Sequence, residues 1–182
     1  MRYSERPELR DSTGDLFADV WPEYNQHGQV LNHYWEQLCD VFPGWQFFLC
    51  DPGNDEVLAE GHTIPVAWDG SDGGLGPGID ATIAAGFQLR AAGGQPTCAC
   101  ALAAEIPARH RGRHLSGVLL QAMARLTREA GLNSLIAPVR PPSKTAIPPF
   151  PSNATPCGLA PTGRRLTPGS GCTPGWVLAS AQ

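Results

Sequence analysis

A basic loop in the middle of the chain carries residue types that bind anions. Arg109, Arg111 and Arg113 occupy alternate positions, Gly112 lies among them, and helical apolar spacing begins at Leu115. A glycine-containing loop between a strand and a helix places free N–H groups and the positive end of the helix dipole at one spot. The loop is therefore predicted to bind an anion such as phosphate. The alternative is a solvated basic loop between buried elements.

The elements on either side of this loop are predicted from hydrophobic spacing. Residues 97–106 are small and apolar, which predicts a buried strand. In residues 115–130, apolar side chains recur at i, i+3, i+4, i+7, i+8 and i+11, which predicts an amphipathic helix that ends at Gly131. Residues 134–139 predict a second short buried strand. Together these elements form a βαβ unit, in which Ser116 is placed to cap the helix.

The residues before the loop complete an α/β pattern. Turn residues at 51–55 separate two apolar stretches and predict a β-hairpin. The predicted elements are helices over 9–24 and 29–41, hairpin strands over 45–50 and 56–67, and a helix over 79–92.

Length and composition limit the classes of function. The 182 residues suit one domain, and 13 Lys+Arg against 17 Asp+Glu give a net charge of −4. No run of apolar residues is long enough to span a membrane, and no apolar segment follows the charged start, so we expect a cytoplasmic protein. The acidic balance also argues against a nucleic-acid partner.

The cysteines predict neither a metal site nor disulfides. They lie far apart except for Cys98 and Cys100, whereas zinc sites use CxxC pairs and disulfide frameworks belong to secreted chains. We expect free, mostly buried thiols. Cys98 and Cys100 share a strand face without a local basic partner, which favours core packing over nucleophilic chemistry. The other cysteines are Cys39, Cys50, Cys157 and Cys172.

The composition changes near residue 140. All carboxylates lie at or before Glu129, and Pro and Gly make up a third of residues 141–182. Proline removes backbone donors, and this segment has no strand alternation or helical stripe. We therefore predict a domain over residues 1–140 and an irregular Pro/Gly-rich tail over 141–182.

Residues 105–116, with the sequence EIPARHRGRHLS, resemble the acetyl-CoA-binding motif of the GNAT-type N-acetyltransferase superfamily. The resemblance continues through the apolar residues of the following helix and includes ALAAE at 101–105 and LIAPVRP at 135–141. With the order of elements upstream it covers residues 5–141, and it looks closest to actinobacterial members.

This resemblance implies a GNAT-like mixed β-sheet flanked by helices, and transfer of an acetyl group from acetyl-CoA to an amine. The amine attacks directly in a ternary complex, a base or ordered water takes its proton, and an acid reprotonates the leaving thiolate. Acetyl-CoA is a cosubstrate, and no metal is implied. The residues implied to bind it are Ile106, Arg111, Gly112, Arg113, His114, Leu115 and Ser116.

One position departs from the family pattern. The Arg/Gln-x-x-Gly-x-Gly/Ala signature falls on 111–116, where His114 replaces the first glycine. That glycine lets the backbone approach the pyrophosphate and adopt a positive φ. In a second register, over 109–114, Gly112 is the first glycine and His114 takes the second position. Either way, a histidine stands where the family has a small residue, and we assign it no chemistry.

Glu105, at the end of the strand before the loop, is the candidate catalytic base. The alternative is a strand-end carboxylate neutralised by the neighbouring arginines. The resemblance implies that Trp21, Tyr24, the hairpin and C-terminal strands build the acceptor pocket, without specifying the amine.

The tail lacks the helix and two strands that family members have after the strand at 134–139. Codons compatible with residues 151–158, read one base over, spell Ile-Glu-Arg-Tyr-Ala-Val-Trp, and residues 166–173 can give Asp-Pro-Trp-Leu-Arg-Val-His. Both strings resemble family blocks in the same order, although the third bases were chosen to suit. The hypothesis is a frame lost between residues 140 and 145, which would leave an exposed sheet edge.

Three alternatives to an active enzyme remain at this level. The first is a non-catalytic acyl-CoA-binding or interaction module, the second is a non-functional frameshifted product, and the third is a basic loop that binds another phosphate ligand.

Overall fold

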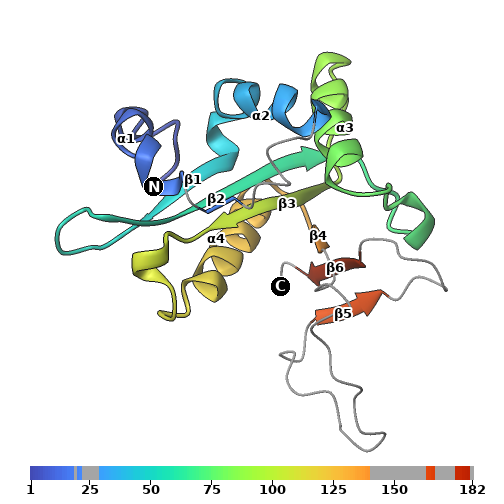
Figure 1. Ribbon diagram of the computed structural model, residues 1–182. Helices are drawn as coiled ribbons and strands as arrows, with labels where there is room; N and C mark the ends of the chain where they lie inside the picture. The colour runs from blue at the N-terminus through green and yellow to red at the C-terminus, as the bar shows by residue number, and fades with distance from the viewer. Residues whose placement is uncertain (19, 22–28, 140–162, 167–174, 181–182) are drawn as a thin grey trace, which may run out of the picture.

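The computed structural model describes residues 1–18, 20–21, 29–139, 163–166 and 175–180 (Figure 1). Its described strands form one sheet in the order β1-β2-β3-β4-β6-β5. The pair β3–β4 is parallel and the other pairs are antiparallel. The strands are β1 (Gln46–Cys50), β2 (Val57–Val66), β3 (Cys98–Glu105), β4 (Ser134–Val139), β5 (Gly163–Leu166) and β6 (Gly175–Ser180).

Helices cover both faces of the sheet, as Figure 1 shows. Helices α2 (Gln29–Val41) and α3 (Ile79–Ala91) pack on one face, and α4 (Leu115–Glu129) packs on the other. The short helix α1 (Glu8–Ser12) lies on the α2 side. Within the described residues, no helix combines the length and the apolar character needed to cross a bilayer. The predicted mixed α/β sheet flanked by helices is confirmed.

The predicted βαβ unit is present at the centre of the sheet. Strand β3 leads through the basic loop into α4, which returns to the parallel strand β4. The apolar stripe predicted for α4 is buried at Leu115, Leu119, Met123 and Leu126, whereas Val118, which the stripe also includes, is exposed. Gly131 follows the helix with a φ of +76°, the left-handed conformation that favours glycine at a helix end. The hairpin and the helices at 29–41 and 79–91 also form where predicted.

The predicted helix over 9–24 is wrong in its extent. Helix α1 ends at Ser12, and a separate 3₁₀ turn follows over Gly14–Phe17. Thr13 separates them, because its hydroxyl donates to the Leu9 and Arg10 carbonyls and its backbone leaves the helical region at φ −110° and ψ 0°. Such side-chain bonds compete with continuation of a helix.

Two short described segments of the tail, which the composition predicts to be irregular, form strands. Strand β6 pairs antiparallel with β4 from Ser134–Ser180 to Val139–Gly175, and β5 pairs with β6. No proline of residues 141–182 falls in either strand, so both retain the backbone donors that a ladder needs. The edge of β4 that was expected to be exposed is covered by β6.

Candidate active site

A β-bulge decides which face of the sheet Glu105 occupies. Strands β2 and β3 pair in register up to Thr63 and Ala101. The next residue of β2, His62, pairs with Ala103, so β3 has one extra residue here. Because side chains alternate between the two faces of a sheet, the extra residue reverses the alternation at the end of β3. Glu105 therefore shares the face of His62 instead of the face covered by α4.

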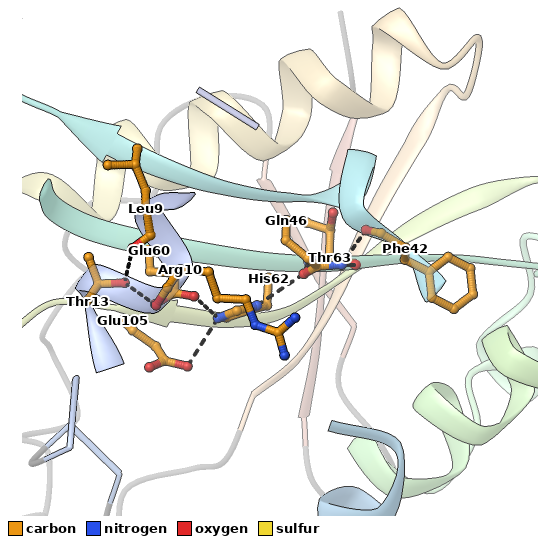
Figure 2. Close-up of polar contacts among 9 residues, drawn as sticks. All are labelled: Leu9, Arg10, Thr13, Phe42, Gln46, Glu60, His62, Thr63 and Glu105. Carbon is orange, nitrogen blue, oxygen red and sulfur yellow. Dashed lines mark hydrogen bonds and ion pairs between the residues drawn. The ribbon is translucent and has the colours of Figure 1, made fainter. Parts of the chain in front are cut away.

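Glu60, His62 and Glu105 form a buried cluster on that face, drawn in Figure 2. Their residues are 8%, 3% and 4% exposed, in that order. The Nε2 atom of His62 lies 3.0 Å from Glu60 Oε1 and 3.5 Å from Glu105 Oε1. A buried charge is tolerated where a partner charge compensates it. An imidazolium between two carboxylates meets that condition.

Gln46 fixes a proton on Nδ1 of the His62 ring. Its Nε2 donates to the carbonyls of Phe42 at 3.1 Å and Thr63 at 2.9 Å, which sets the orientation of the amide. Its Oε1 accepts from the Thr63 N–H at 3.3 Å and lies 3.1 Å from Nδ1 of His62. Because an amide oxygen only accepts hydrogen bonds, Nδ1 carries a proton.

The cluster lies in a cavity of about 540 Å³ lined by the N-terminal segment, α2 and the sheet. Two tryptophans line it. The rings of Trp21 and Trp35 meet edge to face at 5.2 Å, and Trp35 lies 4.8 Å from the His62 ring. Hydrogen bonding from the Trp21 side chain opposes part of the rise in the pKa of Glu105. An apolar cavity with a few convergent polar groups is the usual form of a small-molecule site.

The cavity changes the titration of the groups inside it. Burial raises the pKa of Glu105 to about 7, the His62 charge opposes this rise, and the Glu60 charge adds to it. For His62, burial lowers the pKa, but the hydrogen bond and charge of Glu60 and the charge of Glu105 raise it, and the net direction is upward. Glu105 therefore exchanges its proton in the neutral range.

Among the described residues, this cluster also has ligand atoms spaced closely enough to hold a metal ion. One ligand atom each from Glu60, His62 and Glu105 lies within 4.8 Å of the others. However, Nε2 of His62 faces a carboxylate at hydrogen-bond distance, and Nδ1 donates to Gln46. Both ring nitrogens are thus engaged in hydrogen bonds, and we interpret the cluster as a proton-carrying site.

The basic loop lies directly after Glu105, and its arginines are exposed. Arg111 and Arg113 are exposed, and Arg111 Nε donates to the Ile106 carbonyl at 3.5 Å. The N-cap of α4 is His114, not Ser116 as predicted, and no side chain caps the helix. Ser116 lies inside the first turn. The uncapped N–H groups of this turn remain available to an anion.

His114, which stands where the resemblance expects a glycine, adopts a backbone conformation that favours glycine. Its φ and ψ are +57° and +23°, in the left-handed region that side chains with a Cβ disfavour. The loop therefore keeps the glycine conformation without the glycine. Gly112, two residues earlier, also has a positive φ, +79°.

Strands β3 and β4 separate beside the cluster. Within the described strands they pair only at Ala99–Leu135 and Cys100–Ile136, while β3 continues to Glu105. The end of β3 thus presents an edge without a ladder partner on its β4 side. Ligands of α/β sheets bind at such openings at the carboxyl ends of strands.

Cys98 and Cys100 behave as core residues, as expected, whereas Cys39 and Cys50 are half-buried. Cys98 and Cys100 are buried among apolar side chains, and burial raises the pKa of Cys98 to about 12 and also raises that of Cys100. Cys39 lines the cavity, where burial raises its pKa to about 11. Their thiols stay protonated at neutral pH, which disfavours a cysteine nucleophile. Cys157 and Cys172 lie outside the described residues.

The structure brings some predicted site residues together and adds others. Glu105 is joined to the loop of Ile106–Ser116 by the chain itself, and Trp21 lines the cavity. Tyr24 lies outside the described residues. The predictions did not include Glu60 and His62, nor Gln46, which supports them. Polar residues at alternate positions of an otherwise apolar hairpin strand were the available signal.

Similarity to known proteins supplies further information. No family model matches the chain. It is 26% identical over 160 residues to the arginine N-acetyltransferase avaD of Aspergillus versicolor, an alignment that covers 80% of this chain and 54% of that protein. The chain thus spans about half the length of this curated relative.

Two solved structures share the fold. The GphF GNAT-like decarboxylase in complex with isobutyryl-CoA matches with a TM-score of 0.62 and 12% identity, over 97% of both chains. The loading GNATL domain of CurA from Lyngbya majuscula matches with a TM-score of 0.64 and 15% identity, over 97% of this chain and 94% of that one. At these identities the likeness is one of fold.

Proposed function

We propose that this chain, which has the fold of the GNAT-type N-acetyltransferase superfamily, transfers an acyl group from an acyl-CoA thioester to an amine. Acetyl-CoA is the donor that we expect. Glu105 is the base, and the reaction is a direct attack in a ternary complex.

The observation that carries this proposal is the position and pKa of Glu105. Its carboxylate lies in the cavity, at the end of the strand that leads into the basic loop. Its pKa of about 7 suits a general base, because a catalytic group works best when its pKa is near the working pH. An exposed carboxylate with an ordinary pKa would be a weaker base.

The chemistry balances with one base and no covalent enzyme intermediate. The amine lone pair attacks the thioester carbonyl carbon, the C–S bond breaks, and Glu105 takes the amine proton. The CoA thiolate takes up a proton from water, and Glu105 later releases its own. Amide and free CoA are the products. Holding both reactants in one site replaces a bimolecular encounter, which supplies much of the rate.

The donor is supported by the loop and by the unpaired edge of β3. Phosphates of CoA would be held by Arg111, Arg113 and the uncapped N–H groups of α4, and the pantetheine amides would pair with the free edge of β3. The relevant loop residues are Ile106, Arg111, Gly112, Arg113, His114, Leu115 and Ser116.

The acceptor is supported by the charge of the cavity. Three carboxylates line it against two basic side chains, and two tryptophans complete the lining: Glu36, Glu60, Glu105, Arg10, His62, Trp21 and Trp35. Carboxylates and tryptophan faces attract cations, which favours an amine that carries a second positive charge. Arginine is the first acceptor to test, since one relative is an arginine N-acetyltransferase. The same charge disfavours an acyl group that bears a carboxylate.

The experiment is release of free CoA from acetyl-CoA with arginine and with other small cationic amines. Glu105→Gln should lower kcat by a factor of about 10²–10⁴ and leave the Kd of acetyl-CoA within about twofold. Glu129→Gln is the matched control, because Glu129 is an exposed carboxylate that pairs with Arg2 at the surface. We expect this control to keep full activity.

Two results would contradict the proposal. If acetyl-CoA binds but no amine accelerates its cleavage, the chain is a binding module. If Glu105→Gln retains full activity, another group is the base.

A further inference from the structure

The His62 ring is held in one position by contacts on all sides. Its Nδ1 proton is directed at Gln46, whose amide is fixed by two backbone carbonyls. The rings of Trp35 and Tyr3 lie 4.8 Å and 6.3 Å from it. With Nδ1 committed to Gln46, a second ring proton would be on Nε2, where both carboxylates lie (Figure 2).

Glu105 needs such a neighbour, because one of its oxygens has no hydrogen bond. Its Oε1 is buried and unpaired in the hydrogen-bond network of the described residues, at 3.5 Å from Nε2 of His62. Glu60 Oε1, at 3.0 Å, is the hydrogen-bond partner of that nitrogen. The proton on Nε2 of His62 therefore lies between the Glu60 carboxylate, to which it is hydrogen-bonded, and the Glu105 carboxylate, which it can also reach.

The other charged groups around the cavity come from α1 and α2. Arg10 and Glu36 line the cavity, and Arg10 pairs with Asp40 at 2.6 Å. Tyr3 and Cys39 are the remaining titratable groups that line it. In the described ion pairs, His62 is the basic side chain that lies within 4 Å of the Glu105 carboxylate.

We propose that His62 is a positioning residue for Glu105. The Nε2 proton of His62 lies between the two carboxylates and offsets the charge of Glu60, so that Glu105 stays available as a base. This inference rests on the proposed function for its catalytic meaning. The effect of the His62 charge on the Glu105 carboxylate follows from their distance and does not depend on that function.

The proposal predicts shifts of opposite sign for the two partners. Replacing His62 by a neutral residue leaves Glu105 facing Glu60 without compensation, so the pKa of Glu105 rises and the acid limb of kcat/KM moves to higher pH. Replacing Glu60 by glutamine removes a like charge, so the limb moves to lower pH. If His62 had only a structural role, the two substitutions would lower the rate without moving the acid limb of kcat/KM in opposite directions.

The experiment compares His62→Gln, Glu60→Gln and the unaltered protein over a pH series, with EDTA present throughout. We expect the limb to move up by about one pH unit or more in His62→Gln and down in Glu60→Gln, since a charge within about 4–6 Å shifts a carboxyl pKa by this much. His33→Gln is the matched control, because His33 is exposed on α2. The control should not move the limb.

A measurement without substrate separates this proposal from the transfer reaction. Carbon NMR of the glutamate carboxyls follows the titration of Glu105 directly, and Glu105→Gln assigns its signal. If the opposite shifts appear by NMR but no amine is acylated, the electrostatic role holds and the proposed function fails. If acyl transfer occurs and neither variant shifts the Glu105 titration, the proposal for His62 is overturned.

Loss of folding is controlled by a second variant. His62→Asn keeps an amide near Gln46 while removing the charge, and it should shift the limb in the same direction as His62→Gln. A folded His62→Asn protein, by near-ultraviolet circular dichroism, with the limb of the unaltered protein would also overturn the proposal.

Discussion

The acidic cavity and the basic loop meet at Glu105 and differ in almost every physical respect. The cavity residues Glu60, His62 and Glu105 are buried and come from two antiparallel strands whose pairing contains a bulge. The arginines of the loop are exposed and lie within a few positions of one another in the sequence. The cavity residues are therefore buried in the protein interior, whereas the loop arginines lie at the surface.

This difference has an energetic consequence. Substitutions in the cavity should change folding stability and the titration of the base together, because its polar groups are buried and water cannot replace the hydrogen bonds that they make within the protein. Substitutions of the exposed loop arginines should change donor binding alone, because water replaces any contact that is lost. Three substitutions test this separation.

Gln46→Leu should have the largest effect. It leaves the ring proton of His62 and the N–H of Thr63 without their acceptor, and a buried donor without a partner costs about 1–3 kcal/mol. We expect the free energy of unfolding to fall by about 2–4 kcal/mol, measured by urea denaturation. Gln37→Leu, at an exposed position of α2, should change it by less than about 0.5 kcal/mol. Equal effects of the two would contradict burial as the cause.

Arg111→Ala should have an intermediate effect on donor binding. Loss of one exposed phosphate contact is expected to cost about 1 kcal/mol, or roughly fivefold in the Kd of acetyl-CoA. Calorimetry measures this Kd, and the difference should shrink as salt is added. Arg125→Ala, on the exposed side of α4, is the control and should bind normally. Unchanged affinity in Arg111→Ala would remove the loop from the donor site.

His114→Gly should have the smallest effect. It relieves the left-handed φ of +57°, a conformation that costs a residue with a Cβ about 1–2 kcal/mol, against about 0.5–1 kcal/mol of added chain entropy. Thermal unfolding should show a stabilisation of roughly 0.5–1 kcal/mol, with donor binding as tight or tighter. Gly112→Ala should act in the opposite direction, since Gly112 also has a positive φ. Weaker binding in His114→Gly would give the histidine a role of its own.

The comparison also explains what the sequence could predict. Helical and strand spacing specified α2, α3, α4 and the hairpin, and the basic loop was visible because its residues are contiguous. The cluster was not visible, because Glu60 and Glu105 become neighbours only through strand pairing. The bulge that turns Glu105 toward His62 also has no signal in the small apolar residues of β3.

The tail marks a second limit of sequence reasoning. Composition predicted irregular chain over 141–182, yet β6 extends the sheet beyond β4 through a short segment without proline. The frameshift hypothesis stays a prediction. Sequencing the gene across the codons for Val139 to Pro151 tests it, and the adjacent frame should encode the Ile-Glu-Arg-Tyr and Trp-Leu-Arg-Val-His blocks. Absence of both blocks would refute it.

The most direct test of Glu105 as the base is the pH dependence of kcat/KM for acyl transfer. Glu105 must be deprotonated to accept a proton, so kcat/KM, calculated on the concentration of neutral amine, should be constant above a pKa of about 7 and fall tenfold per pH unit below it. In Glu105→Gln the residual rate should lack this limb. The same limb in Glu105→Gln would show that another group titrates, and Glu105 would then not be the base.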